Sequence, residues 1–157
     1  MLLNHYTAFL EKHLQGKSAT LINENGTTGA FGIFDYQAKE ALLPMLLHQS
    51  ATIIIGSDNT PETGDSYCLK KIITSGLNVA LTRSVQDNDD GSCSSIVVAN
   101  ITNTSSAPIT VGEIGIRKNV GYTSVTVAVV FDRTPLGTPL TIQPGEVGRI
   151  VYTITMS

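Results

Sequence analysis

The stretch "TPLTIQPGEVGRIVYTITM", residues 138–156, decides the fold. Apolar side chains stand at every second position on both sides of a Pro144-Gly145 step. Side chains on a strand alternate between two faces, so this spacing predicts two half-buried strands joined by a turn at residues 143–146. Even-numbered residues should face the core, and odd-numbered residues should face solvent or a neighbouring subunit. The apolar positions are Leu140, Ile142, Ile150, Tyr152, Ile154 and Met156.

The same alternation continues upstream, across residues 67–157. Apolar positions of one parity run from Val79 to Val85, from Cys93 to Ile101 and from Val125 to Phe131. The first two runs are separated by "DNDDG", which is typical of a tight turn. About seven short strands at this spacing predict an antiparallel β-sandwich of immunoglobulin-like type. The chain has no Trp and therefore lacks the Cys–Trp–Cys signature of true immunoglobulin domains.

One strand of this region changes parity in its middle. In "ITVGEIGIRKN" the apolar residues Ile109 and Val111 are odd-numbered, whereas Ile114 and Ile116 are even-numbered. A β-bulge inserts one extra residue into a strand and so shifts the faces of all residues that follow. The sequence therefore predicts a bulge at Gly112-Glu113.

The segment before the sandwich, residues 1–56, predicts a small α/β unit, so that the whole chain is α+β but mainly β. Residues 19–34 read as two strands around an Asn25-Gly26 turn. A second helix should begin at Asp35 and end or kink at Pro44. "ATIIIG", residues 51–56, is typical of a buried strand. Residues 57–66 hold no aliphatic side chain and predict a linker loop between 1–56 and the sandwich at 67–157.

The first fourteen residues carry an apolar stripe at helical spacing, followed by Gly16 as a stop. So short a helix is marginal alone and has to dock somewhere. It packs either on its own domain or on a neighbouring subunit, and the spacing leaves both open. The candidate subunit-contact residues are Leu2, Leu3, Tyr6, Phe9, Leu10 and Leu14.

Composition narrows the classes of function. The 157 residues are 41% hydrophobic but only 15% charged, with a net charge of −3. A surface of small neutral side chains can be packed against copies of itself at little desolvation cost. The adjacent pair Lys70-Lys71 predicts a solvated strand edge, and no basic cluster indicates nucleic acid as a main partner. No apolar run reaches the ~18 residues of a membrane span, and the start lacks the basic region of a signal peptide.

No pattern in the sequence predicts catalysis. There is no GxSxG, GxGxxG or GxxxxGK[ST] motif. The histidines His5, His13 and His48 lack the spacing of metal ligands. The acidic residues of "DNDDG", Asp87, Asp89 and Asp90, could bind calcium, but a solvated hairpin turn is favoured because the pattern of an EF-hand is missing. We therefore expect a non-enzymatic protein with no cofactor and no metal.

Three smaller features have structural interpretations. Cys68 and Cys93 are too few for a disulfide framework, and free buried thiols are favoured over a pair. Sequons at Asn25, Asn100 and Asn103 carry no weight without a secretory signal. Asp132-Arg133, just before the closing hairpin, predicts an ion pair or a strand-end feature. Neither of these two residues is expected to form a functional site.

Three segments, in order, resemble segments of virion proteins of tailed bacteriophages. They are "IIIGSDNTPETGDSYCLKK", "ANITNTSSAPITVGEIGI" and "VFDRTPLGTPLTIQPGEVGRIVYTI", which together span about residues 52–155. The shared positions are turn glycines, turn prolines and core aliphatic residues. "GSDNT", residues 56–60, departs from the Gly-Thr-Gly that related segments often carry.

The resemblance implies a β-rich accessory protein of the virion, assembled in the host cytoplasm. We expect a homo-oligomer in the tail or neck, whose partners are copies of itself and other virion proteins. A capsid decoration protein is the alternative within the same class. A receptor- or carbohydrate-binding module is the alternative outside it, with Tyr67, Tyr122 and Phe131 as the aromatic platforms.

Overall fold

The structure of the chain is a computed structural model. No helix within its described part is long and apolar enough to cross a membrane. The residues that it describes are Ala8, Glu11, 19–31, 51–63, 65–122 and 125–156.

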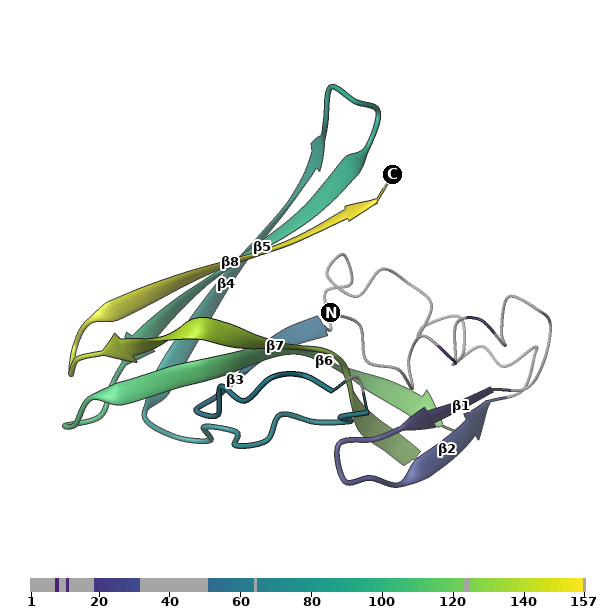
Figure 1. Cartoon of the computed structure of the whole chain (residues 1–157), viewed down its shortest axis with the longest axis horizontal. Coiled ribbons are helices and arrows are strands. Elements are labelled where there is room, and N and C mark those ends of the chain that lie inside the picture. The colour runs from purple at the N-terminus through teal and green to yellow at the C-terminus, as the bar shows by residue number, and fades with distance from the viewer. Residues whose placement is uncertain are drawn as a thin grey trace.

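Most of the described chain forms two antiparallel sheets of three strands that face each other (Figure 1). One sheet has the order β3-β6-β7, with strands at Ala51–Gly56, Ile109–Tyr122 and Val125–Ile142. The other has the order β4-β5-β8, with strands at Leu77–Asp87, Cys93–Asn103 and Val147–Met156. The predicted antiparallel β-sandwich is confirmed.

The described sandwich has six strands instead of about seven. The alternating run that ends at Phe131 and the run at Leu140–Ile142 were expected as separate strands, but both belong to the single strand β7. Pro135 does not end β7, because β7 lies at the edge of its sheet, where a missing N–H costs no ladder hydrogen bond. Strand β3, expected in the N-terminal segment, pairs with β6 inside the sandwich.

The hairpin of β7 and β8 has the predicted turn and the predicted faces. Gly145 has a φ of 78°, and the Glu146 N–H donates to the Gln143 carbonyl at 3.0 Å. This is a four-residue turn with Pro at its second and Gly at its third position, the sequence preference of type II. Even-numbered Ile142 and Ile150 are buried, whereas odd-numbered Val147 and Val151 are exposed. The alternation is confirmed up to Tyr152; the side chains of Ile154 and Met156 lie outside the described residues.

The register between β6 and β7 shifts where the bulge was predicted, between Val111 and Glu113, but Gly112 alone stands opposite residues 136–139, so the extra residues lie in β7. The shift turns Val111, Ile114 and Ile116 toward the same core, where each is at most 3% exposed. It leaves Glu113 on the opposite, outer face of the sheet. A second register shift follows between Ile116 and Arg117.

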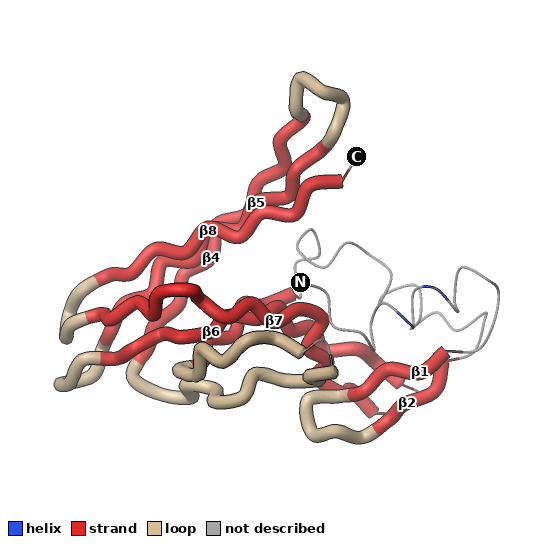
Figure 2. Tube along the Cα trace, viewed as in Figure 1, coloured by secondary structure: helices blue, strands red, loops and turns tan. Residues whose placement is uncertain are grey.

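A long loop, residues 57–76, covers the outer face of the β3-β6-β7 sheet (Figure 2). Leu69 in this loop packs with Val130, Ile54 and Cys68 as a second, smaller apolar cluster. The Ile73 N–H donates to the Ile55 carbonyl at 2.8 Å, so part of the loop runs along the free edge of β3. The segment expected as a linker, 57–66, therefore lies against the sandwich.

A small hairpin of β1 (Ala19–Ile22) and β2 (Thr28–Phe31) lies beside the β6–β7 end of the sandwich (Figure 1). Its turn contains the predicted Asn25-Gly26, with a φ of 79° at Gly26. Within the predicted first helix the structure describes Ala8 and Glu11, both helical; its contact residues and the predicted helix after Asp35 lie outside the described residues. So do the three histidines. The contact residues concerned are Leu2, Leu3, Tyr6, Phe9, Leu10 and Leu14.

Candidate functional site

A dense group of charged side chains lies between the long loop and the β3-β6-β7 sheet. We call Arg133, Glu113, Glu62 and Asp58 the Arg133 cluster. Arg133 Nε lies 2.6 Å from Glu113 Oε2, and both side chains are 0% exposed. Arg133 Nη1 lies 3.0 Å from Glu62 Oε2, and Nη2 lies 3.4 Å from Asp58 Oδ1. One guanidinium thus bridges β6, β7 and the loop.

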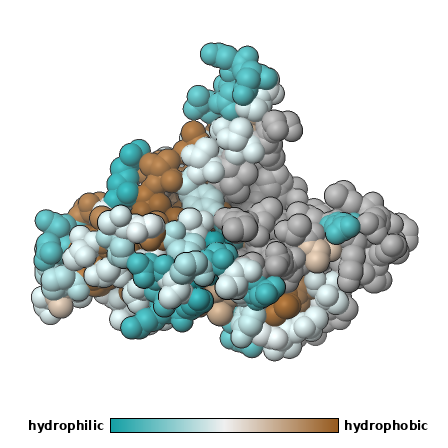
Figure 3. Space-filling model, viewed as in Figure 1, coloured by the Kyte–Doolittle hydropathy of each residue, from teal (hydrophilic) through white to brown (hydrophobic). Residues whose placement is uncertain are grey.

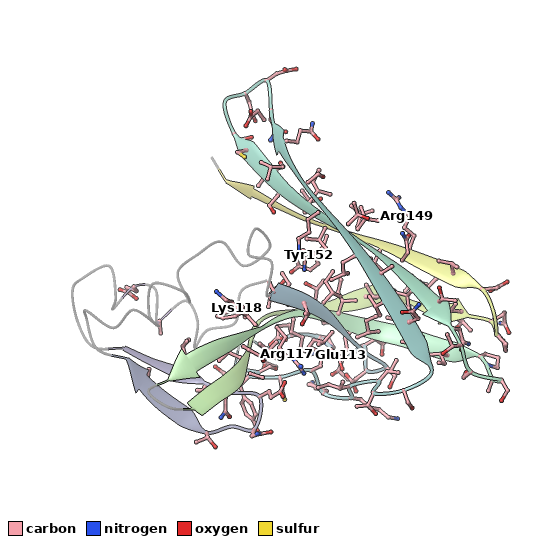
Figure 4. The ribbon with its side chains drawn as sticks, turned by 180° about the vertical axis from the view of Figure 1, so that it is seen from behind. Glu113, Arg117, Lys118, Arg149 and Tyr152 are labelled. Carbon is pink, nitrogen blue, oxygen red and sulfur yellow. The ribbon has the colours of Figure 1, made fainter. Side chains whose placement is uncertain are left out.

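Glu113 receives two further hydrogen bonds from the loop backbone. The Lys70 N–H donates to Oε2 at 3.2 Å, and the Lys71 N–H donates to Oε1 at 2.8 Å. Lys70 and Lys71 are solvated, as predicted, but they lie in the loop and not in a strand. Figure 4 shows Glu113 on the side of its sheet that faces away from the β4-β5-β8 sheet. The buried carboxylate is therefore compensated on both oxygens, which a buried charge requires.

The surroundings of the cluster shift the pKa values of Arg133 and Asp58. Burial alone would lower the pKa of Arg133, but hydrogen bonds to Glu62 and Glu113 outweigh it and raise the pKa above its usual value. The Thr60 hydroxyl and the Thr60 N–H donate to Asp58 Oδ1 at 2.5 and 2.9 Å, and these bonds lower the pKa of Asp58. Both shifts favour the charged forms, the guanidinium of Arg133 and the carboxylate of Asp58.

The lowered pKa of Asp58 predicts part of the acid sensitivity of the fold. A carboxyl whose pKa is lower in the folded chain stabilises it above the unfolded value, about 3.9, and loses that contribution as the pH falls through the folded value. Between about pH 6 and pH 3, wild type should therefore lose more unfolding free energy than Asp58→Asn. Denaturant titrations at both pH values measure this. Asp89→Asn, which removes an exposed carboxyl outside the loop, is the control, and equal losses for Asp58→Asn and wild type would contradict the prediction.

Gly112, next to Glu113, lets the loop approach the sheet. A Cβ at this position would lie 2.6 Å from the Ser57 carbonyl oxygen and 2.9 Å from that of Asp58. Because backbone must move to relieve the overlap, Gly112→Ala should lower the free energy of unfolding by about 1–3 kcal/mol. Gly137→Ala, in open space on β7, should change it by less than about 0.5 kcal/mol. Urea denaturation compares the two, and equal effects would show that the loop yields freely.

Another buried polar residue, Asn103, holds the end of the sandwich at which the β7–β8 turn lies. Its Nδ2 donates to the carbonyls of Ala107 and Ile142, both at 2.8 Å. Its Oδ1 accepts from the Ser105 N–H at 2.9 Å and from the Ser105 hydroxyl at 2.7 Å. The backbone of Asn103 also bonds to Gly145 and Glu146 in the β7–β8 turn. Asn103 is 0% exposed, so in the folded chain the amide nitrogen of this sequon is buried and hydrogen-bonded.

A third polar group lies between the two sheets. Tyr152 Oη and Thr134 Oγ1 are 3.5 Å apart, and Thr134 Oγ1 donates to Asp132 Oδ2 at 3.4 Å. Burial raises the pKa of Asp132. Figure 4 shows Tyr152 between the sheets and Arg149 on the outer side of β8. This group is a weak polar link between β7 and β8, because both distances are long for hydroxyl hydrogen bonds.

The structure also places the residues that were considered as metal ligands, disulfide partners or aromatic platforms. Among the described residues, no group of three His, Cys, Asp or Glu side chains could hold a metal ion. The predicted "DNDDG" turn joins β4 to β5, with Asp90 Oδ1 accepting from the Ser92 N–H at 2.9 Å. Cys68 and Cys93 are free and half-buried. The interpretation of Phe131 as an aromatic platform is wrong, because its side chain is 0% exposed in the core.

Tyr67 is exposed, and the side chain of Tyr122 lies outside the described residues. The sequence pointed to Arg133, and to Asp58 and Glu62 as weak calcium candidates, but did not connect Arg133 with these acids or with Glu113. Glu113 gave a signal that could have been used, since it is the one charged residue in the apolar stretch "ITVGEIGI". The Arg133 cluster and Asn103 both hold loops on the sandwich. The polar contacts described for Arg133, Glu113 and Asn103 are all to other parts of the chain. In comparisons with known proteins, no family model, no curated protein and no solved structure matches the chain.

Proposed function

We propose that this chain is a non-enzymatic structural protein of a tailed-bacteriophage virion, which assembles with copies of itself in the tail or neck. The observation that carries the proposal is where the family-like segments lie. The segments around Asn103, Glu113, Arg133 and Gly145 belong to the sandwich and its turns. Their polar side chains form hydrogen bonds and ion pairs within the chain. The segments whose sequence resembles virion proteins therefore lie in the scaffold, which supports the proposal.

The surface of the sandwich gives further support. The outer face of the β4-β5-β8 sheet carries the even-numbered residues of β4 and β5 and the odd-numbered residues of β8. Among these described residues, Arg149 is the single charged side chain, and the rest are small, amide or aliphatic. Figure 3 shows apolar surface beside β8. A face with few charges loses little hydration when it is packed against a neighbouring subunit.

Electron microscopy of phage particles with a labelled chain tests the location. We expect label at one vertex of each particle, where tail and neck join the capsid. Label spread over the whole shell would instead favour a capsid decoration protein. Particles without label, from cells that make the labelled chain in full amount, would contradict both virion assignments.

A further inference from the structure

We propose that the exposed edge of β4 is the surface through which two copies of this chain pair, antiparallel and about a two-fold axis. This inference rests on the self-assembly part of the proposed function and names the surface that would perform it. It does not depend on where in a virion the protein lies. The occupant of the edge is the same strand of a second copy.

The two edges of the β3-β6-β7 sheet are protected, whereas no described residue bonds to the backbone of the free edges of the other sheet, β4 and β8. In the β3-β6-β7 sheet, the loop residue Ile73 bonds to β3, and the Glu24 N–H donates to the Ala128 carbonyl of β7 at 3.0 Å. Strand β7 also contains Pro135 and Pro139, which lack an N–H. These are the usual means by which proteins prevent edge-to-edge pairing.

The edge of β4 has none of these features within the described part of the chain. It is 11 residues long, contains no proline and pairs only with β5. Every residue from Thr82 to Asp87 is exposed, and Val85 is 57% exposed. The β4–β5 hairpin also extends beyond the other sheet, with its hydrophilic tip pointing away from the molecule (Figure 3). A second copy can therefore reach this edge.

The hydrogen-bonding parity of β4 determines which residues would pair. The Asn88 N–H donates to the Ser92 carbonyl, and the Thr104 N–H donates to the Gly76 carbonyl. The even-numbered residues of β4 therefore face β5, and the odd-numbered residues direct their N–H and C=O groups outward. An antiparallel copy would bond through Arg83, Val85 and Asp87, with about six backbone hydrogen bonds in total.

The charges on this edge are complementary to themselves. When Val85 of one copy lies opposite Val85 of the other, Arg83 of each copy lies opposite Asp87 of its mate. The pairing therefore makes two cross-strand ion pairs and one aliphatic pair, as an isologous interface requires. Within one chain Arg83 and Asp87 are four residues apart on a strand, a span of roughly 13 Å, too far for an ion pair. The guanidinium also donates to the Ala51 carbonyl, which fixes its stem and leaves other N–H groups for a partner.

A charge-swap series in the full chain tests the pairing. Arg83→Asp alone and Asp87→Arg alone each place like charges opposite one another, and each should weaken the dimer by about tenfold or more in dissociation constant. The double variant Arg83→Asp with Asp87→Arg should restore wild-type affinity. Analytical ultracentrifugation over a range of concentrations measures the three constants. Failure of the double variant to recover wild-type affinity would overturn the β4–β4 pairing. Pairing of β4 with a different strand would also give that result.

A cysteine cross-link tests the register. Directly opposed residues of a hydrogen-bonded antiparallel pair have Cα atoms about 5.5 Å apart, within the range that a disulfide spans. Val85→Cys should therefore form a covalent dimer under mild oxidation, above the background of wild type with its Cys68 and Cys93. Val147→Cys is the matched control, because Val147 is equally exposed, at 59% against 57%, but lies on β8. Equal cross-linking of both variants would contradict the proposed register.

The outcomes separate this inference from the proposed function. Oligomers that persist unchanged in both single charge variants would overturn the β4 interface and leave self-assembly standing. A wild type that is monomeric at all concentrations would overturn both. A dimer that passes both tests, from a protein absent from phage particles, would keep the interface and reject the virion role.

Discussion

Replacing Arg133 by methionine should lower the free energy of unfolding by about 3–5 kcal/mol. Methionine matches much of the stem but leaves Glu113 and Glu62 without their cation, and the carboxylates are 0% and 4% exposed. An uncompensated buried charge is far more costly than a lost surface ion pair. The loss should appear in urea denaturation at neutral pH. Loop 57–66 should also become susceptible to proteolysis, since three of its contacts end on the guanidinium.

Arg149→Met is the matched control, because Arg149 is an exposed arginine on the outer face of β8. Its substitution should change the free energy of unfolding by less than about 0.5 kcal/mol. Arg133→Lys should behave more like the methionine variant than like wild type, because one ammonium is too small to reproduce the planar fork that reaches three carboxylates. A loss below about 1 kcal/mol for Arg133→Met would show that the cluster is not structurally essential.

The second large effect is expected at Asn103. Asn103→Asp keeps the shape of the side chain but replaces the two N–H donors to Ala107 and Ile142 by an acceptor. A carboxylate would then face two carbonyl oxygens in a site that is 0% exposed. We expect a loss of about 3 kcal/mol or more, the sum of two unsatisfied acceptors and one buried charge.

Thermal and urea unfolding measure this loss. Asn100→Asp, in the same strand but half-buried, is the control and should be nearly neutral. The deficit of Asn103→Asp should shrink in acid, where the introduced carboxyl is protonated and uncharged. A variant as stable as wild type at neutral pH would mean that the loop rearranges around the charge.

Much of the sandwich follows from short-range pattern. Alternation of apolar residues located β5 and β8, because a half-buried strand leaves a period of two in the sequence. The parity change at Gly112 located the register shift for the same reason. The turn at Pro144-Gly145 was predictable because its residues fit a type II turn, which needs a positive φ at the glycine.

The failures have a different physical origin. The Arg133 cluster joins residues that are 20 to 75 positions apart in the chain. No local sequence pattern indicates which carboxylate an arginine pairs with in the folded chain. The continuity of β7 was missed because Asp132-Arg133 was interpreted as an ion pair or a strand-end feature. The long loop that covers the outer face of the sheet explains why Arg133 is buried within the strand. Asn103 did give a signal, since Asn-Thr-Ser before Ala-Pro is also the pattern of an Asx turn, in which the side chain bonds two residues ahead.

The long reach of Arg133 has a consequence for the time course of synthesis. Its partners Glu62 and Asp58 precede it by 71 and 75 residues. At typical elongation rates of 5–20 residues per second, Arg133 is synthesised roughly 4–15 s after the acidic residues of the loop. Nascent chains halted before Arg133 should be cleaved in the loop by added protease, and chains with Arg133 outside the tunnel should resist; equal cleavage would refute this. The loop that covers the sheet can therefore dock only after Arg133, far downstream in the sequence, has left the ribosome.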